Sequence, residues 1–382
     1  MKSKRLSLVT ATAVLLCLTA CGEQAASGQR APSSQTVTQS LTRVEFVQLI
    51  EQLSEPSGYF DTDNLISNET SYLHVIGEME ELEVEGGVYV GVGPAQNFSY
   101  IAQVRPEIAF IIDIRRDNLL QHLLFKALFG LSSTRIDYLC LLTATPLPEN
   151  PQEWSDRPIS ELVAYVDRTP SSDVTIDNTR RAVTERVTES GVALDAEMLA
   201  TIERLHQEFT KAGLSLRFQS FNRPPRPDYP TLRQLLLETD RSGEQRNFLA
   251  KEEDFQFVKS LEDRNLVVPV VGDLAGQHAL SAIGNYVADR DQIISAFYTS
   301  NVEFYLVRQG TFPSFAQTVS GLPIDERSVI IRSYFNRGFS GRLPQYVPGY
   351  NSTQLLQRIE TFVTSYEQGR YRTYWDLISG GD

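Results

Sequence analysis

The sequence predicts an α/β protein with a doubly wound, mostly parallel, Rossmann-like sheet, helices on both faces and an irregular insertion. Three observations lead to this prediction. Short apolar runs rich in β-branched residues alternate with longer stretches of helical spacing, which is the order of right-handed βαβ units. The run Ile108–Ile114 is apolar at nearly every position, as in a parallel strand that is covered on both faces. Glycines stand at the end of the run Val88–Val92, where a strand of such a sheet turns into a helix.

The first residues of the chain have the pattern of a bacterial lipoprotein signal. Two lysines and an arginine precede an apolar run, residues 6–18, and the run ends at the small-residue motif Leu18-Thr19-Ala20-Cys21. Because the run is too short to span a bilayer comfortably, we expect residues 1–20 to be cleaved and Cys21 to carry lipid that anchors the chain to a membrane. Gly22, in place of Asp, favours the outer membrane within a bacterial cell envelope. The alternative is an ordinary signal peptide that ends in cysteine.

A tether and one domain follow the leader. Residues 21–40 are rich in Ser, Gln, Ala and Thr, a composition that cannot bury enough apolar area to fold, so we expect a flexible tether. Thr42 and Glu45 are spaced as a capping box, which predicts that an ordered domain of residues 41–382 begins with a helix. Five prolines between residues 141 and 192 interrupt every candidate element there, so this segment is predicted to be an irregular surface insertion.

The remaining elements follow from apolar spacing and capping residues. Strands are expected at residues 88–92, 108–114, 214–218, 266–271, 293–298, 304–307 and 329–334. Helices are expected up to Arg105, at 119–131 behind Asp117, from Asp195 to Gly213, at 279–289 and from Ser352 to residue 366. In the third of these helices, an acidic residue near the start and a lysine near the end match the helix dipole.

Composition excludes several classes of function. The formal net charge is −13 and no basic tract offsets it, which argues against broad binding of nucleic acid. Of the three cysteines, one leaves with the leader and Cys21 is acylated, so Cys140 has no partner for an intramolecular disulfide. The four histidines are scattered and none has metal-ligand spacing with a cysteine, so a structural zinc site is not expected.

The most informative candidate site is the loop that follows the first strand and ends at Asn97. Gly91 and Gly93 permit a tight turn and close backbone approach, and the helix that follows offers free N–H groups. Asp113 ends the next strand 20 residues after Gly93, where a dinucleotide fold places the acid that accepts from ribose hydroxyls. Together these residues indicate nucleoside binding. Gln96, however, stands in place of the third glycine of the fingerprint, and a two-glycine loop is also a common tight turn.

Polar residues also stand at the ends of two later strands. Asp273 follows one apolar run, and Tyr298, Asn301 and Glu303 lie at the end of the next. Because the carboxyl ends of parallel strands meet at one edge of the sheet, these four side chains are candidates to line a pocket and to have a catalytic role there. The alternative is loop capping, since Asp, Asn and Ser commonly bond neighbouring backbone groups.

The segment 59–69 precedes the first strand and concentrates polar residues, among them Asp61 and Asn64. We expect it to form a lid over the glycine loop, with both of these residues beside the ligand. A calcium loop with Asp61, Asp63 and Glu69 as ligands is the alternative, but the segment lacks the central glycine and the final glutamate spacing of an EF-hand. Further along, Arg115 and Arg116 are either ligands for a carboxylate or phosphate or part of an ion-paired face.

Four stretches resemble a known family: residues 59–73, 89–114, 265–273 and 297–306. They are similar to uncharacterised bacterial proteins, some of them lipoproteins, whose fold resembles that of class I S-adenosylmethionine-dependent methyltransferases. The resemblance implies a methyltransferase-like domain with S-adenosylmethionine as its possible cofactor. It also implies that Gly91 and Gly93 match the cofactor loop and that Asp113 matches the ribose-binding acid.

The expected compartment decides between the functional hypotheses. S-adenosylmethionine is made and kept in the cytosol, whereas a processed lipoprotein is displayed outside the inner membrane. We therefore expect a membrane-anchored, methyltransferase-like domain that has lost or repurposed the chemistry and binds a small molecule or a protein partner at the strand ends. One alternative is an active methyltransferase, in which Asp273, Tyr298, Asn301 and Glu303 position the acceptor. The other is an envelope protein that interacts through its surface alone.

Overall fold

The computed structural model describes residues 40–221, 223–224, 226–336 and 343–380. The predicted signal, the predicted lipidation site Cys21 and nearly all of the predicted tether therefore lie outside the described residues. Among the residues that are described, no helix has both the length and the apolarity needed to cross a bilayer.

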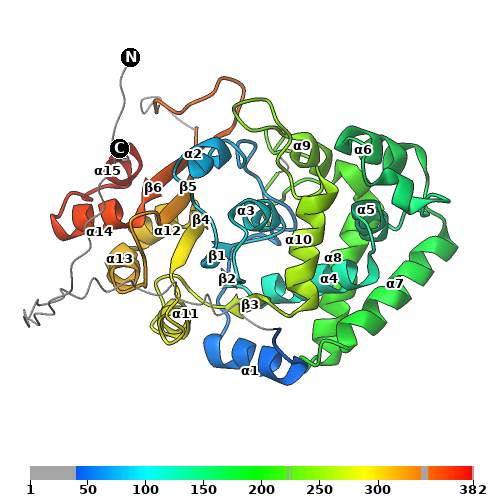
Figure 1. Cartoon of the computed structure of the whole chain (residues 1–382), viewed down its shortest axis with the longest axis horizontal. Coiled ribbons are helices and arrows are strands. Elements are labelled where there is room, and N and C mark those ends of the chain that lie inside the picture. The colour runs from blue at the N-terminus through cyan, green and yellow to red at the C-terminus, as the bar shows by residue number, and fades with distance from the viewer. Residues whose placement is uncertain (1–39, 222, 225, 337–342, 381–382) are drawn as a thin grey trace, which may run out of the picture. The chain divides into compact units, whose positions relative to one another are not determined.

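One six-stranded sheet, in the order β3-β2-β1-β4-β5-β6, forms the centre of the fold (Figure 1). Its strands are β1 (Val88–Val92), β2 (Ile108–Asp113), β3 (Val267–Val271), β4 (Ile294–Ser300), β5 (Val329–Phe335) and β6 (Ser352–Arg358). The first five run parallel, and β6 runs antiparallel to β5. The chain winds outward from β1 through β2 to β3 and then crosses to β4 on the other side of β1. This reversal places the topological switch point between β1 and β4, where wound sheets bind ligands at the carboxyl ends of their strands.

Helices cover both faces of the sheet, which confirms the predicted doubly wound α/β class (Figure 1). One layer consists of α3 (Gln96–Val104), α4 (Arg116–Leu131) and α10 (Glu252–Asp263). The other includes α1 (Arg43–Leu53), α11 (Ala279–Ala288), α12 (Val302–Gln309) and α13 (Phe312–Ser320). The short α2 (Ile76–Glu81) precedes β1, and α14 (Ile359–Glu367) and α15 (Tyr374–Ser379) follow β6.

Helices fill much of the segment 141–192, which the sequence predicts as irregular. They belong to a group of helices that packs outside α4. This group consists of α5 (Arg135–Thr143), α6 (Ile159–Arg168), α7 (Asp173–Thr188), α8 (Ala196–Ala212) and α9 (Leu232–Leu237). The prediction of irregular chain is wrong because two of the prolines stand at helix boundaries and not inside helices. Pro158 is the N-cap residue of α6, and Pro170 precedes the Ser172 cap of α7.

Three other predicted elements are wrong. Residues 304–307, expected as a strand, lie inside α12, since a short apolar run does not distinguish a strand from a helix. Residues 214–218 contain a 3-10 turn and a single bridge from Arg217 to Thr231 instead of a strand. The helix expected from Ser352 begins only at Ile359, because β6 pairs with β5 as an edge strand.

Two predicted helix starts are confirmed by their caps. Thr42 Oγ1 accepts from Glu45 N at 3.2 Å, and the Glu45 carboxylate accepts from Thr42 N at 2.7 Å, which is the reciprocal pattern of a capping box. Asp195 accepts from Met198 N at 2.8 Å at the start of α8. By contrast, Asp117 lies in the first turn of α4 and not at its cap.

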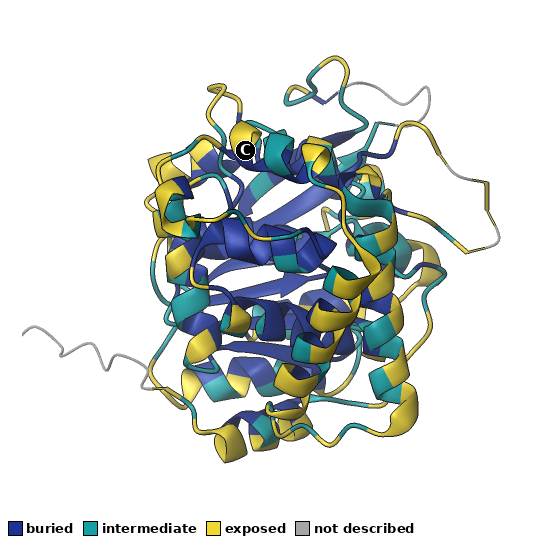
Figure 2. Ribbon diagram, turned by 90° about the vertical axis from the view of Figure 1, so that its right-hand side faces the viewer, coloured by how far each residue is buried: buried dark blue, intermediate teal, exposed yellow. Residues whose placement is uncertain are grey.

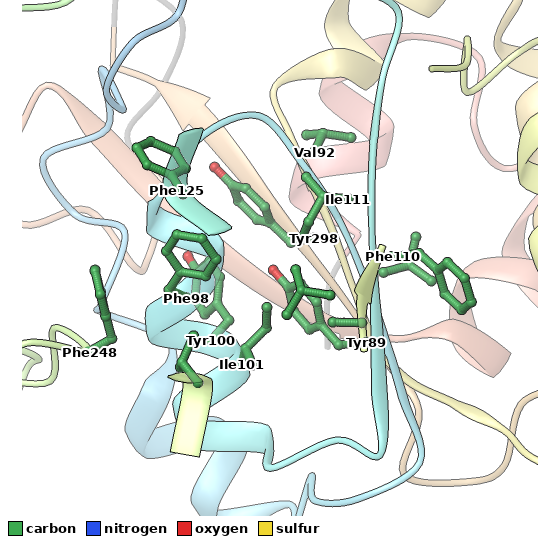
Figure 3. Packing of buried hydrophobic residues seen from close by; sticks show 14 of the residues in the cluster. Tyr89, Val92, Phe98, Tyr100, Ile101, Phe110, Ile111, Phe125, Phe248 and Tyr298 are labelled. Carbon is green, nitrogen blue, oxygen red and sulfur yellow. The ribbon is translucent and has the colours of Figure 1, made fainter. Parts of the chain in front are cut away.

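The core lies between the sheet and its helical layers, as the dark central strands of Figure 2 show. On the α3 side, the rings of Tyr89, Tyr100 and Tyr298 lie close together (Figure 3), and the centroids of the last two are 5.0 Å apart. Phe98 makes edge-to-face contacts with Phe125 and Phe248. Such aromatic pairs stabilise a core by about 0.5–1.5 kcal/mol each beyond the burial of their area. The Tyr298 hydroxyl is bonded to Gln96 and Glu69, so this core extends to the residues at the strand ends.

Candidate functional site

A pocket opens at the carboxyl ends of four neighbouring strands, β3, β2, β1 and β4. It encloses about 890 Å³, open solvent at its mouth included. Five of the predicted site residues line it: Asn64, Gly93, Asp113, Asp273 and Asn301. The pocket therefore spans the switch point between β1 and β4, which is where the fold class places a ligand site.

Gly93 is the glycine of the loop that faces the pocket. Its φ of +83° is a conformation that residues with a side chain rarely adopt. A Cβ at this position would lie 3.2 Å from Asn64 Nδ2 and 3.3 Å from Gln96 Nε2. Two side-chain amides therefore flank a point of the loop at which a ligand can approach the backbone closely.

Asn97 and His122 hold the loop from behind. Asn97 Nδ2 donates to three carbonyls of the loop, at 2.9 Å to Val92, 3.2 Å to Gly93 and 2.7 Å to Pro94. His122 Nε2 lies 2.9 Å from the Gly93 carbonyl oxygen. Burial lowers the pKa of His122 to about 4, so the ring is neutral near neutral pH and donates through Nε2–H. Asn97, predicted to bind the cofactor, thus shapes the loop and lies outside the pocket lining.

Gly91 serves packing and does not line the pocket. A Cβ at this position would lie 2.1 Å from Asn97 Oδ1 and 2.6 Å from the Tyr89 hydroxyl oxygen. These two atoms form a hydrogen bond of 2.8 Å with each other. The core therefore requires the first glycine of the loop, and the pocket requires the second.

Asp113 lines the pocket, but Arg115 engages both of its carboxylate oxygens. Arg115 Nε donates to Oδ1 at 3.0 Å, and Nη2 donates to Oδ2 at 2.8 Å. The same guanidinium donates through Nη1 to the carbonyl oxygens of Thr62, at 3.2 Å, and Asp63, at 2.6 Å. Of the two alternatives for Arg115, the structure has the ion pair. The pair fastens the segment 59–69 to the end of β2.

Glu69 lines the pocket although only 1% of its surface is exposed. Its carboxylate accepts from the Tyr298 hydroxyl at 2.7 Å, from Gln354 Nε2 at 2.7 Å and from Ser300 Oγ. Burial, and to a lesser extent the Glu69 charge, raises the pKa of Tyr298 well above its usual value, so the phenol remains a donor. The sequence points to Glu69 only as a calcium ligand, because its partners in β4 and β6 lie 229 to 285 residues along the chain.

Gln96, in the position of the missing third glycine, is a further site residue that the sequence does not reveal. It lines the pocket with 9% of its surface exposed. Its Nε2 donates to the Tyr298 hydroxyl at 3.3 Å, while its Oε1 has no hydrogen-bond partner. A buried carbonyl oxygen without a partner costs about 1–3 kcal/mol. A ligand that donates a hydrogen bond would remove this cost.

Backbone strain also occurs at the pocket. Asn64 and Ser300 both line it, and both have left-handed φ values of +51° and +53°. This conformation costs about 1–2 kcal/mol for a residue with a side chain, although Asn tolerates it better. At Ser300 the strained turn ends β4 at a register shift and brings Oγ to the Glu69 carboxylate. Strain of this kind is concentrated at functional sites.

Of the four residues predicted to have a catalytic role, Asp273 and Asn301 line the pocket, whereas Tyr298 and Glu303 do not. Asp273, in the pocket wall, accepts from Ala275 N through Oδ1 at 2.9 Å. Tyr298 lies outside the pocket lining, and its hydroxyl is bonded to Gln96 and Glu69, which line it. Glu303 lies outside the pocket lining and forms a buried ion pair of 2.7 Å with Arg332.

Asp61, predicted to lie beside the ligand, is also outside the pocket lining and forms an ion pair with Arg223. Other residues of the segment 59–69 do line the pocket beside the glycine loop. The three acidic residues weighed as calcium ligands do not converge. Within the ranges that the structure describes, no group of three or more His, Cys, Asp or Glu side chains is arranged to hold a metal ion.

Aromatic side chains also line the pocket. The rings of Phe60 and Tyr305 meet edge to face, with centroids 5.0 Å apart and planes at 87°. Tyr59, beside them, is 76% exposed. Two perpendicular rings and a third, exposed one offer π faces to a planar or cationic group.

The fold and the pocket define a doubly wound α/β protein with a ligand-sized cavity at its switch point. Residues 65–157 and 159–373 match the family described as "Domain of unknown function (DUF7790)", and the chain belongs to this family. The match includes all six strands together with Glu69, Gly93 and Gln96. No protein of curated function matches the sequence.

Proposed function

We propose that the protein is a membrane-tethered binding protein whose strand-end pocket takes a small, nucleoside-type molecule, with methyl-transfer chemistry lost or repurposed. The observation that carries this proposal is the Gly93 corner of the pocket, where the Asn64 and Gln96 amides flank the backbone of Gly93 in the pocket lining. Side-chain amides offer both a donor and an acceptor, as recognition of a base requires. The unpartnered Gln96 Oε1 supplies one such acceptor.

The charges of the pocket favour a ligand without phosphate groups. Arg115 is the basic residue among the described lining residues, and its guanidinium is already bonded to Asp113. Glu69 and Asp273 add negative charge to the same lining. A nucleotide would bring phosphates beside these carboxylates, and like charges in such contact cost on the order of several kcal/mol. A nucleoside brings no negative charge, and S-adenosylmethionine offsets its one carboxylate with an ammonium and a sulfonium.

The leader sequence supports the membrane tether. We propose that Cys21 is lipidated after cleavage and anchors the domain in the bacterial envelope, with the outer membrane favoured. Metabolic labelling with a palmitate analogue tests this part of the proposal. Cys21→Ser should abolish the label and release the chain from the membrane fraction, whereas a label that persists would contradict lipidation at this residue.

An active S-adenosylmethionine-dependent methyltransferase is the second candidate. Asp273 and Asn301 in the pocket wall favour it, because methyl transfer mainly requires alignment of donor and acceptor. Tyr298 and Glu303, the other two predicted positioning residues, are bonded to Glu69 and Arg332. Incubation of the protein with cell extract and methyl-labelled S-adenosylmethionine separates the candidates. Labelled product would establish methyl transfer, whereas binding of S-adenosylmethionine without labelled product would support a binding protein that lacks this activity.

Isothermal titration calorimetry of the full chain in detergent, with adenosine, S-adenosylmethionine and S-adenosylhomocysteine, tests the proposed function. We expect at least one of the three to bind. Gln96→Met should weaken that binding by about tenfold, because one hydrogen bond to a buried partner is worth about 1.4 kcal/mol. Gln103→Met, the same change on the same helix outside the pocket lining, is the matched control. No binding, or equal loss in both variants, would favour the third hypothesis of a protein that interacts through its surface.

A further inference from the structure

Acceptors are prominent in the pocket lining, and one of them, the buried Gln96 Oε1, has no hydrogen-bond partner. The carboxylates of Glu69 and Asp273 and the amide oxygen of Gln96 are all acceptors. The guanidinium of Arg115, the strongest donor in the lining, is bonded to Asp113 and to two backbone carbonyls. A ligand that complements this pocket therefore has to bring donors, and preferably positive charge.

Glu69 is the lining residue for which a positively charged ligand matters most. The side chain is 99% buried, and its three partners are neutral: a phenol, a hydroxyl and an amide. Among the described residues, the Glu69 carboxylate has these three hydrogen-bond donors and is part of none of the ion pairs. An ionised carboxylate has about four lone-pair sites, so one site remains beside Ser300 after three bonds. A buried charge without an opposite charge is costly, and a cation in the pocket would offset that cost.

Gln96 is the second, independent observation. Its amide is 91% buried in the same pocket and leaves Oε1 without a partner. The Tyr298 hydroxyl accepts from Gln96 Nε2 at 3.3 Å and donates to Glu69 at 2.7 Å, so both side chains lie within one hydrogen bond of the same oxygen. Gln96 Oε1 and the Glu69 carboxylate are therefore neighbouring acceptors of the same pocket.

The aromatic wall suits the same kind of ligand. Phe60 and Tyr305 stand perpendicular to each other in the lining, and a cation over a ring face gains about 0.5–2 kcal/mol. The Tyr305 hydroxyl is also bonded to Asn301. Ser300 Oγ in turn bonds to Asn301 and to Glu69, so a chain of hydrogen bonds joins Tyr305 to Glu69. Carboxylate and aromatic rings are thus parts of one wall.

We infer that the ligand of this pocket is an organic cation, held by the Glu69 carboxylate and the Gln96 amide oxygen beside the Phe60 and Tyr305 rings. The inference rests on the proposed function, because it names the chemical class of the molecule that the strand-end pocket binds. It excludes phosphorylated and carboxylate-only ligands, and it requires a positive nitrogen or sulfur centre.

Two matched pairs of probes test the inference with the full chain in detergent. Choline is compared with dimethylbutanol, its neutral carbon isostere, and S-adenosylmethionine is compared with S-adenosylhomocysteine, which lacks the sulfonium charge. In calorimetric titrations the cationic member of a pair should bind about tenfold more tightly than the neutral member. Glu69→Gln should erase this preference. Glu161→Gln, which removes an equal charge from an exposed face of α6, should preserve it.

The outcomes separate this inference from the proposed function. Equal binding of the cationic and neutral members in the wild-type chain would overturn the inference and leave nucleoside binding intact. Failure of every probe to bind would overturn both. A preference that survives Glu69→Gln would overturn the assignment of Glu69 as the cation's partner. Because the main comparison is made in the wild-type chain, it does not depend on how well the variant folds.

Discussion

Glu69 and Glu303 are buried to the same extent, but only Glu303 has an oppositely charged partner. Each side chain is 1% exposed. Glu303 forms two bonds with the Arg332 guanidinium, at 2.7 Å and 3.1 Å, and Gln357 accepts from a third nitrogen of the same group. Glu69 has only neutral donors and lies in the wall of a pocket.

The difference distinguishes scaffold from site. The network around Glu303 is complete within the protein, so it needs nothing from solvent or ligand. The network around Glu69 is electrically incomplete and borders an orphaned amide oxygen at Gln96 and a strained residue at Ser300. Uncompensated charge, an unpartnered polar atom and backbone strain each destabilise the folded protein. Such destabilising features are typical of functional sites, where ligand binding offsets them.

The largest expected effect is on the scaffold side. Glu303→Gln should lower the free energy of unfolding by about 3–5 kcal/mol, because it leaves the buried Arg332 charge without its partner. Urea denaturation measures this loss. A loss below about 1 kcal/mol, the range of an exposed pair, would break the comparison, since Glu303 would then be no better compensated than Glu69.

His122 gives the next largest effect and concerns the support of the glycine loop. Its pKa falls from 6.5 to about 4 on folding, so the neutral ring is the form that stabilises the protein. The stabilisation is fully present above pH 6.5 and is lost as the pH falls towards 4, by about 3 kcal/mol in total.

The variant His122→Gln isolates this contribution, because it keeps a donor for the Gly93 carbonyl and cannot titrate. Unfolding free energies at several pH values should show the wild-type chain losing more stability than the variant between neutral pH and about pH 4. Parallel curves for the two proteins would show that the buried ring is not the titrating group and would weaken the description of the loop's support.

The two glycines of the loop sharpen the comparison further. Gly91→Ala should cost about 1–3 kcal/mol through overpacking, because the new Cβ would displace the Asn97 side chain. Gly93→Ala should cost about 1–2 kcal/mol through its positive φ, and it should also weaken ligand binding. Denaturation and calorimetry on both variants check this division. Equal effects on binding would show that the two glycines have the same role.

Local patterns were sufficient to predict the winding, the parallel strands and the glycine loop. The continuous apolar run of β2 and the two glycines after β1 are signals within one short segment, so the sequence contains them directly. The roles of Glu69 and Gln96 were not predictable, because each depends on a hydroxyl that β4 brings to the same place. The edge strand β6 was missed for a similar reason: its residues are held as a strand by pairing with β5 and not by their own spacing.

The stability of the ligand-free Glu69→Gln variant tests the central claim most directly. A glutamine can place its carbonyl oxygen towards Tyr298 and Gln354 and its amide towards Ser300, so the bonds are kept while the buried charge is removed. We predict that its free energy of unfolding in urea equals that of the wild type or exceeds it by up to about 2 kcal/mol, opposite in sign to the change for Glu303→Gln. A loss of about 3 kcal/mol or more would show that Glu69 is as fully compensated as Glu303 and would contradict the claim that this carboxylate awaits a ligand.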